Sequence, residues 1–446
     1  MGKRNRKIVF KRNIALSYFI MIILGTILLF SPITTSSNNH VSLIDAFFVS
    51  ASAFTDTGLT PISIHESFNR FGQIVILILV QVGAIGLMTM KAVLFLLINK
   101  KISTADRMMI HNEQRQTKVS GMVKLIKDAV LILLSAQILF TIIVTLHMVL
   151  FYDHSILNSL WFSYFHVTSA LTNVGFDLTG SSLAAFSTDY LFQSYIMFLI
   201  ILGGLGFPVL IDIKRYCIAR KNKESFRFSL FSKISFYTYF IVGIIGFIII
   251  LFLDYEFIFV EQEGMKGVFY ALFQVVSSRS CGLVTLDLNS FSSGSQLVLG
   301  LLMFIGAAPA STGGGVRTTT IALMVLYLIN FASNKRDVEA FNRRIPMDTI
   351  FKAFVSFSIG GILVVLSSVL IIGLNSNVPI IDIVFEVTSA FGTTGMSLGI
   401  TKNFEPISKI IIALLMMIGQ LGITNAMIVF SRNKEDSNTI RLPEEN

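Results

Sequence analysis

Four short polar stretches, each ending in glycine, are the residues of this sequence best suited to chemistry. Each follows an apolar segment and precedes one large apolar residue. They read Thr55-Asp56-Thr57-Gly58, Thr172-Asn173-Val174-Gly175, Arg279-Ser280-Cys281-Gly282 and Gly392-Thr393-Thr394-Gly395. Glycine accepts positive φ angles that other residues resist, so successive carbonyl groups can point the same way. Because a ring of carbonyls can replace the hydration shell of a permeating cation, the stretches predict an ion selectivity filter.

The glycines belong to an internal repeat. Gly58, Gly175, Gly282 and Gly395 are 117, 107 and 113 residues apart, and a second motif begins 25, 28, 24 and 24 residues after them. Its copies are Gly83-Ala84-Ile85-Gly86, Gly203-Gly204-Leu205-Gly206, Gly306-Ala307-Ala308-Pro309 and Gly419-Gln420-Leu421-Gly422. A single GxxG is more typical of close helix packing. Four copies of two motifs in one fixed order argue strongly against coincidence.

A Ser-Ala pair lies at the same distance before the glycine in three of the four units. Ser-Ala pairs lie upstream of the first, second and fourth glycines, whereas the third unit departs from this register. The pairs are Ser52-Ala53, Ser169-Ala170 and Ser389-Ala390, and the third unit has Val276-Ser277 instead.

The elements that must position these stretches are apolar enough to require lipid. The chain has 446 residues, 53% of them hydrophobic, a mean hydropathy of +0.74 and only 14% charged residues. Most of its longer apolar runs could cross a hydrocarbon layer of ~30 Å as helices. These runs are 14–29, 74–98, 129–151, 194–211, 234–253, 297–305, 350–374 and 410–430. Between them lie shorter segments, 44–54, 160–171, 267–277 and 381–391, which predict re-entrant half-helices.

The predicted fold is therefore an all-α membrane protein with four helix–pore loop–helix units around a pseudo-four-fold pore. It would have eight spanning helices and four re-entrant half-helices. We expect unit 1 at 8–100, unit 2 at 123–220, unit 3 at 228–335 with an interrupted inner helix, unit 4 at 346–434, and a cytoplasmic tail at 435–446. The half-helix C-termini would point at the ring, and their negative dipole ends favour a cation.

The distribution of charge predicts the topology. Lysine and arginine gather at the N-terminus and in alternate connections, while the intervening connections are rich in acids. This positive-inside pattern predicts that both termini are cytoplasmic and explains the net charge of +9 without nucleic acid. The two cysteines, Cys217 and Cys281, are predicted on opposite faces, so neither a disulfide nor a metal site is expected.

The combination of motifs resembles the Ktr/Trk/HKT superfamily of potassium transporters, and most of all the bacterial Ktr membrane subunit. The resemblance rests on the four-fold plan, on one glycine in each loop, and on Ala310-Ser311-Thr312-Gly313-Gly314-Gly315 within the third inner segment. It implies potassium uptake across a bacterial plasma membrane, with potassium held at the filter residues and sodium as a possible activator. It also implies a homodimer and a cytosolic ring of nucleotide-binding RCK-type subunits, so nucleotide would bind only to a partner.

The break in the third inner segment, from Gly306 through Pro309 to Gly315, matches the intramembrane gating loop of that superfamily. Non-helical backbone at this depth must face water or protein, so the loop could obstruct the pore and move aside. A simple kink is the alternative. Arg317 follows the loop, where a charge marks either a functional residue or a side chain that snorkels to the interface.

Three charged or polar residues near the predicted ring need separate interpretation. The superfamily usually has an arginine where this chain has Gln420, which leaves electrostatic gating at that position in doubt. Asp56 could face the ion, or it could turn behind the loop and accept hydrogen bonds from backbone amides. Arg279 could pair with Asp56 or support the third loop, since a positive side chain in the ring would oppose conduction.

Two other classes of function compete with a pore. A secondary symporter for another cation or a small solute would be equally apolar, but such folds generally use two-fold repeats. An intramembrane enzyme would need clustered carboxylates or a His/Cys/Asp constellation, and the six histidines form no paired motif. We therefore expect no enzymatic activity and no covalent cofactor.

Overall fold

The computed structural model describes residues 3–36, 40–86, 89, 122–153, 155–262, 264–334 and 337–423, with only the backbone described at 3–14 and 122–126. The predicted tail at 435–446 and the last residues of units 1 and 4 lie outside this range. The described chain is mostly helical, as expected for an all-α membrane protein.

Four long apolar helices begin the four predicted units. They are α1 (Lys3–Phe30), α7 (Met122–Tyr152), α11 (Leu230–Leu253) and α15 (Met347–Leu374). Within the described residues α7, α11 and α15 are long and apolar enough to cross a membrane, and the apolar part of α1 is Ala15–Phe30. Their outward faces carry exposed isoleucine and leucine side chains, for example Ile244 and Leu370, as a lipid-facing surface requires.

Each long helix is followed by a shorter helix that leads into one glycine stretch. These helices are α2 (Leu43–Phe54), α8 (Ile156–Leu171), α12 (Met265–Ser277) and α16 (Ile380–Gly392). Their C-terminal halves are mostly buried, whereas the first residue of each is exposed. Ser42 begins α2 as an N-cap, because its hydroxyl accepts the Asp45 amide at 3.1 Å.

The inner helices end at glycine in all four units, although the sequence predicted an interruption only in the third. They are α4 (Arg70–Ile85), α9 (Tyr190–Gly204), α13 (Ser293–Ile305) and α17 (Pro406–Leu421). The positive-φ glycines that follow are Gly86, Gly206, Gly306 and Gly422. At this angle a glycine cannot continue a right-handed helix, so 13 to 16 residues form each helix rather than one full span.

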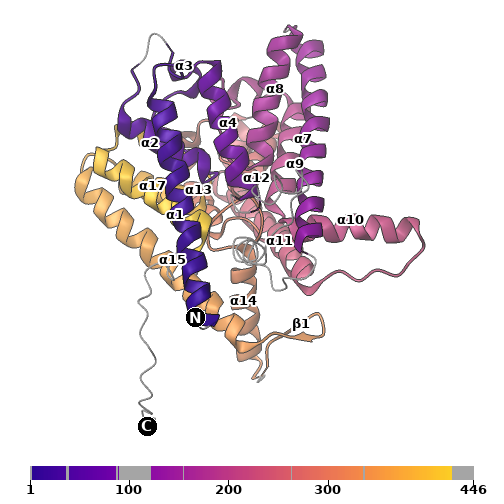
Figure 1. Cartoon of the computed structure of the whole chain (residues 1–446). Helices are drawn as coiled ribbons and strands as arrows, with labels where there is room; N and C mark the ends of the chain where they lie inside the picture. The colour runs from indigo at the N-terminus through magenta and orange to yellow at the C-terminus, as the bar shows by residue number, and fades with distance from the viewer. Residues whose placement is uncertain are drawn as a thin grey trace.

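The break in unit 2 turns the chain sharply. The sequence predicted one spanning run at 194–211, but α9 and α10 (Phe207–Lys221) meet at 103°. Figure 1 shows α10 running across the direction of α7 and α9 at their lower end. In the third unit the chain resumes as α14 (Thr318–Ala332) after the predicted gating loop.

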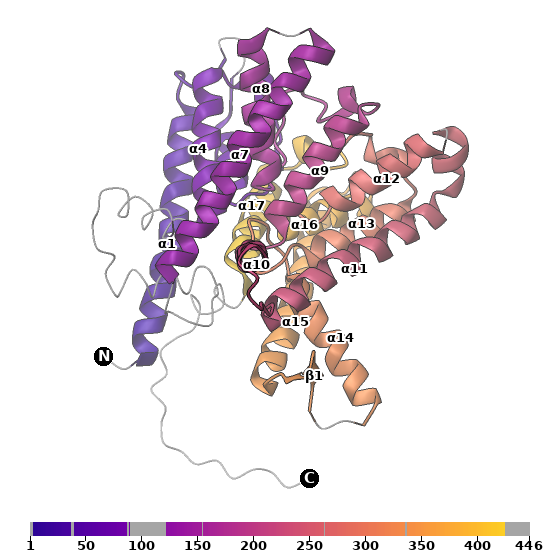
Figure 2. The same ribbon diagram turned by 90° about the vertical axis from the view of Figure 1, so that its right-hand side faces the viewer.

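The four units form a closed cycle of helix contacts. Each short helix packs against the inner helix of the preceding unit: α8 against α4, α12 against α9, and α16 against α13. The cycle closes where α2 packs against α17, at opposite ends of the sequence. Figure 2, turned by 90°, shows α17 in the space between α7 and α9, and α16, α13 and α12 on the other side of α9.

The remaining elements are short. They are α3 (Ile64–Ser67), the 3-10 helices η1 (Ala184–Phe186), η3 (Leu288–Ser290) and η4 (Thr401–Asn403), the π-helix η2 (Phe257–Glu261), and an antiparallel hairpin of β1 (Glu339–Ala340) with β2 (Arg343–Arg344). The hairpin lies beside the lower part of α14, at the same end of the molecule as the start of α1 (Figure 1).

Candidate functional site

The four glycine stretches share a backbone conformation. Gly58, Gly175, Gly282 and Gly395 have φ angles of 88°, 80°, 81° and 90°. The residue two positions earlier also has positive φ in every stretch, at Asp56, Asn173, Ser280 and Thr393. Alternation of this kind turns successive carbonyl groups toward one side, which a chain of ordinary residues resists.

The glycines bring the four stretches together. A Cβ atom built on Gly58 would lie far inside contact distance of the Val174 carbonyl oxygen, and one on Gly175 would meet the Cys281 carbonyl in the same way. Likewise, Gly282 faces the carbonyl of Thr394, and Gly395 faces that of Thr57. All four approaches are closer than 3.0 Å, nearer than a real Cβ comes to another atom. The contacts run from the first stretch to the second, third and fourth and back to the first.

In the third unit the segment between the serine and the stretch glycine is one residue shorter than in the other units, which explains the departure from the serine register. In units 1, 2 and 4 the backbone amide before the stretch glycine donates a hydrogen bond to the carbonyl of the shared serine, five residues earlier, at 2.9–3.0 Å. The pairs are Thr57 with Ser52, Val174 with Ser169, and Thr394 with Ser389. In the third unit the Cys281 amide donates to Ser277, only four residues earlier, at 2.8 Å.

The side chain of Ser277 confirms that it takes the place of the shared serine. The Ser277 hydroxyl donates to Leu283 O at 2.6 Å, as the Ser169 hydroxyl donates to Phe176 O at 2.7 Å. Both acceptors directly follow the stretch glycine. Ser277, and not Val276, is therefore the counterpart of Ser52.

The second glycine motif supports the stretches from the inner helices. Cβ atoms on Gly83, Gly203 and Gly419 would overlap the carbonyl oxygens of Phe54, Leu171 and Phe391, respectively. These carbonyls lie four residues before the stretch glycines, at the ends of the short helices. Glycine is needed in the inner helices because the helix ends rest directly on their backbone.

The predicted gating loop lies against the stretches. A Cβ atom on Gly313 would overlap the Ser280 hydroxyl, and one on Gly314 would overlap the Thr393 side chain. Thr312 reaches the second unit, where its hydroxyl donates to Gly203 O at 3.4 Å. The structure therefore brings the predicted gate residues into contact with the predicted filter residues.

Gln420 links the loop to the first stretch. Its amide nitrogen donates to Asp56 Oδ2 and to Thr312 O, both at 3.1 Å. Asp56 is fully buried. Its carboxylate accepts a hydrogen bond from the Gln420 side chain rather than from the backbone amides that the sequence suggested. One neutral side chain thus connects the fourth inner helix, the first stretch and the loop.

Arg317 is buried, with 6% of its surface exposed, and does not snorkel to the interface. Its guanidinium donates to the carbonyls of Ala308 and Gly313 within the loop. Its φ and ψ of 88° and 140° match those of Gly206, 87° and 142°, and both residues begin a helix after a break. A position held by glycine in the other units is therefore held by arginine here.

The other loop residues make contacts within the loop and with the chain between α9 and α10 of unit 2. The Ser311 hydroxyl donates to Ala308 O at 2.6 Å, and Cβ atoms on Gly306 and Gly315 would crowd Gly314 and Phe304. The Ala310 carbonyl accepts from Phe207 N at 2.8 Å, and Pro309 faces Gly206. The loop is thus hydrogen-bonded to the first residue of α10.

Comparison of the sequence with known proteins identifies the family. The sequence matches TrkH, a family of cation transport proteins, over residues 11–441. The chain belongs to the TrkH family. It is therefore a membrane transporter and not an enzyme, and the resemblance to the Ktr/Trk/HKT superfamily is confirmed.

Curated relatives of this TrkH-family chain span its whole length. It is 34% identical to Ktr system potassium uptake protein D of Bacillus subtilis, over 95% of this chain and 94% of the relative. It is 32% identical to the potassium/sodium uptake protein NtpJ of Enterococcus hirae, over 100% and 98% of the two chains. The crystal structure of the potassium transporter TrkH from Vibrio parahaemolyticus shares the fold, with a TM-score of 0.72 at 17% identity, over 94% of this chain and 83% of that one.

Three features of the family site were missed by sequence reasoning. The second glycine of the motif in units 1, 2 and 4 was visible, but it was interpreted as part of a packing landmark and not as a helix end. Ser277 could have been found by allowing a one-residue deletion in the third unit. The conformation of Arg317 had no sequence signal, because arginine rarely adopts positive φ.

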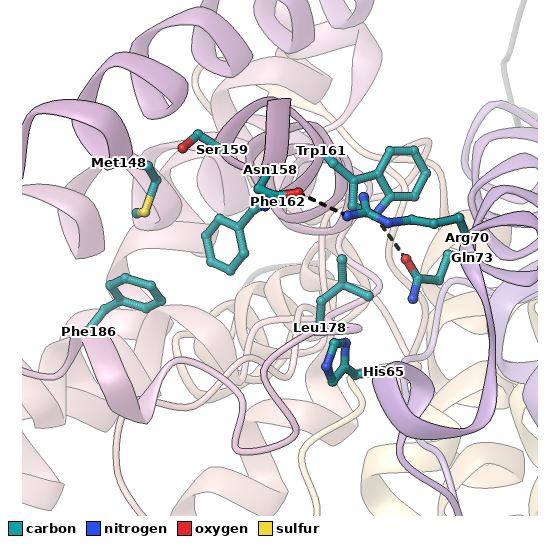
Figure 3. Close-up of a pocket in the computed structure, with 10 residues that line it drawn as sticks. All are labelled: His65, Arg70, Gln73, Met148, Asn158, Ser159, Trp161, Phe162, Leu178 and Phe186. Carbon is teal, nitrogen blue, oxygen red and sulfur yellow. Dashed lines mark hydrogen bonds between the residues drawn. The ribbon is translucent and has the colours of Figure 1, made fainter. Parts of the chain in front are cut away.

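A separate pocket of about 290 Å³ lies between units 1 and 2, beside the first turns of α4 and α8. Figure 3 shows the Arg70 guanidinium over the Trp161 ring, at 5.1 Å from its centroid, and bonded to Asn158. Trp161 Nε1 in turn donates to Gln73 at 2.9 Å. None of the residues lining this pocket belongs to the four stretches, so we assign it to packing between the two units.

Proposed function

We propose that this TrkH-family chain takes up potassium ions through a selectivity filter made of the four glycine stretches. The cycle of glycine–carbonyl contacts is the observation that carries the proposal. It would bring the backbone around Thr57, Val174, Cys281 and Thr394 about one pseudo-four-fold axis, where main-chain oxygens could replace the water around a dehydrated ion.

The predicted units, 8–100, 123–220, 228–335 and 346–434, would each supply one quarter of this filter. In the same proposal α2, α8, α12 and α16 are re-entrant half-helices that enter from the outer side. Their carbonyl ends lie next to the stretches, and the partial negative charge of helix C-termini favours a cation there. The helix ends alone would therefore favour cations over anions, and the filter would need no negatively charged side chain for this purpose.

The loop from Gly306 to Gly315 would be the gate. It contacts the stretches through Gly313 and Gly314, and Arg317 and Gln420 hold it closed by hydrogen bonds to its carbonyls. Movement of the loop away from the ring would open a path for the ion.

The cellular setting follows from the relatives and from charge. Relatives named as components of a Ktr system support a partner subunit, which we propose to be a cytosolic ring of nucleotide-binding RCK-type subunits on a homodimer of this chain. The name of the Enterococcus relative supports a role for sodium as activator. The basic connections support an orientation with both termini in the cytoplasm, and the Bacillus relative supports a bacterial plasma membrane.

The test uses cells that lack their own potassium uptake. Expression of the chain, with and without a cytosolic partner subunit, should restore growth at low potassium. If growth fails in both cases while the protein is present in the membrane, the assignment is wrong.

Gly395→Ser tests the filter against a matched control. The new side chain would meet Thr57 O, so uptake should lose preference for potassium over sodium. Gly399→Ser is the control, because Gly399 has a similar φ of 85° in the same connection but no atom within 4 Å of an added Cβ. Equal selectivity of the two variants in flux measurements would remove Gly395 from the filter.

A further inference from the structure

Three cations line a cavity of about 470 Å³ beside the β1–β2 hairpin. Arg227 lies in the connection between α10 and α11, Lys233 in the first turn of α11, and Arg343 in β2. Arg227 and Arg343 are exposed and Lys233 is half-buried, so polar atoms of the lining reach the cavity. Within the described part of the chain, no acidic residue lines the cavity and no carboxylate pairs with any of the three cations. The cavity therefore favours an anion.

Aromatic rings join the hairpin to α11 at the edge of this cavity. Lys233 Nζ lies 5.3 Å from the centre of the Phe341 ring, which also lines the cavity. The same ring stacks on Tyr237, with centroids 5.8 Å apart. A ring face attracts the Lys233 ammonium but supplies no hydrogen-bond acceptor of full charge, so Lys233 can still bind an anion.

An apolar stripe of α11 begins directly beside the cavity. Residues three or four positions apart share one face of a helix, so Lys233 is followed on its face by Tyr237, Ile241, Ile244 and Ile248. These four side chains are 52–58% exposed, on a helix long and apolar enough to cross a membrane. The order of cations, aromatic ring and hydrocarbon matches the order of head group, interface and acyl chain in a lipid.

We propose that the cavity binds the phosphate head group of an anionic phospholipid, represented by phosphatidylglycerol. Arg227, Lys233 and Arg343 would donate hydrogen bonds to the phosphate oxygens, and an acyl chain would lie along the stripe from Tyr237 to Ile248. The leaflet is the cytoplasmic one in the orientation proposed above, where anionic lipids meet basic pockets between helices. A soluble phosphate would use the same cations but not the stripe, so experiment can separate the two sources.

The binding test uses the full chain in detergent micelles and native mass spectrometry, with phosphatidylglycerol as the probe. It should bind about ten-fold more tightly than phosphatidylcholine with the same acyl chains, because the choline cation offsets the phosphate charge. Inorganic phosphate and glycerol 3-phosphate should not displace the lipid at equal concentration, since they lack acyl chains. Equal binding of phosphatidylcholine would remove the role of charge, and displacement by phosphate would assign the site to a soluble anion. Either result would overturn the proposal.

Arg343→Gln locates the bound head group. Loss of one cation near an anionic lipid should weaken phosphatidylglycerol binding about five-fold. Arg344→Gln is the matched control, because this neighbouring arginine does not line the cavity and pairs with Asp337 at 2.7 Å. That pair is exposed and adds little to stability, so the control should bind the lipid as the wild type does. Wild-type binding by Arg343→Gln, or an equal loss in both variants, would contradict the assigned site.

The path of the acyl chain has its own test. Phosphatidylglycerol with a photoreactive group in the acyl chain should cross-link to α11 between Tyr237 and Ile248, and Arg343→Gln should reduce these cross-links while Arg344→Gln should not. Cross-links that avoid this part of α11, or that are the same in both variants, would overturn the assigned path. These readouts measure lipid binding alone and are independent of potassium uptake.

Discussion

At the residue scale, Arg317 combines backbone strain with a bonding role. A non-glycine residue at φ 88° and ψ 140° costs about 1–3 kcal/mol. Its guanidinium bonds to Ala308 and Gly313 offset this cost, and no glycine could make them. Arg317 therefore adopts a strained backbone conformation, and its hydrogen bonds stabilise the loop that we propose as the gate.

Arg317→Gly should separate these two effects. The substitution relieves the strain but removes charge-assisted bonds worth about 1.5–3 kcal/mol, so thermal stability should change little while ion flux increases. Arg317→Ala keeps the strain and loses the bonds, and should melt at a lower temperature than Arg317→Gly. Thermal unfolding in detergent and flux into liposomes measure both quantities. Equal melting temperatures for the two variants would show that the strain is not significant.

Gln420→Met tests the bridge between the first stretch and the loop. The near-isosteric apolar side chain leaves Asp56 Oδ2 and Thr312 O without this donor, and an unsatisfied buried acceptor costs about 1–3 kcal/mol. Thermal unfolding should show the loss. In a double-mutant cycle with Asp56→Asn, the two effects should be less than additive. Strict additivity would mean that the two side chains do not interact.

At the element scale, the short helices and the stretches could be predicted, but the shape of the inner helices could not. Apolar segments of 10 to 12 residues bounded by polar glycine-rich stretches have a distinctive pattern, and α2, α8, α12 and α16 were found close to their predicted bounds. By contrast, a glycine in an apolar helix is compatible with both packing and termination. The bend between α9 and α10 depends on the hydrogen bond from Phe207 to Ala310, over a hundred residues away, which local sequence cannot report.

The candidate site, too, could be predicted from the sequence only in part. Fixed spacing identified the four glycines, because a repeated landmark needs no knowledge of the fold. The partner of Asp56 lies 364 residues away and the environment of Arg279 includes Tyr239 on another helix, so neither could be deduced from spacing.

Asp189 links two elements outside the proposed pore and gives a pH prediction. It caps α9 through the Phe192 amide at 2.9 Å and accepts from His147 and Tyr152. Burial acts to raise the pKa of Asp189, but the Phe192 amide and His147 outweigh it and hold the pKa below its usual range. Its contribution to stability is therefore present above the ordinary aspartate pKa, near 4, and is lost as pH falls through the lowered folded pKa.

Asp189→Asn keeps an oxygen that can cap α9 but removes the negative charge that His147 and the N-terminus of the helix favour. It should accordingly destabilise the protein at neutral pH by about 0.3–1 kcal/mol. Melting temperatures of the two proteins should converge as the pH falls from about 4 through the lowered folded pKa of Asp189, where the wild-type carboxylate becomes protonated. A difference that stays constant through that acid range would contradict the role of the charge.

At the scale of the whole molecule, charge and helix arrangement agree. In Figure 1 the start of α1 and the β1–β2 hairpin lie in the lower part of the molecule, and the basic helix α10 extends from the lower end of α7. Lys214 on α10 pairs with Asp128 on α7 at 2.7 Å, which holds α10 against the base of that helix. We propose that this end faces the cytoplasm.

Cysteine labelling tests that orientation. Cys217 on α10 is exposed and Cys281 is completely buried. A membrane-impermeant maleimide should label inside-out vesicles but not intact cells, and Cys217→Ser should abolish the labelling. Rapid labelling of intact cells would place α10 on the opposite side of the membrane.

The cycle of glycine–carbonyl contacts has a consequence for how this protein can vary. Pores assembled from four identical chains change at every position of the ring when one codon mutates. Here each quarter is encoded separately, as the one-residue deletion in the third quarter already illustrates. Natural selection can therefore adjust ion preference in small steps, one quarter at a time, and three unaltered neighbours preserve the geometry while the fourth diverges.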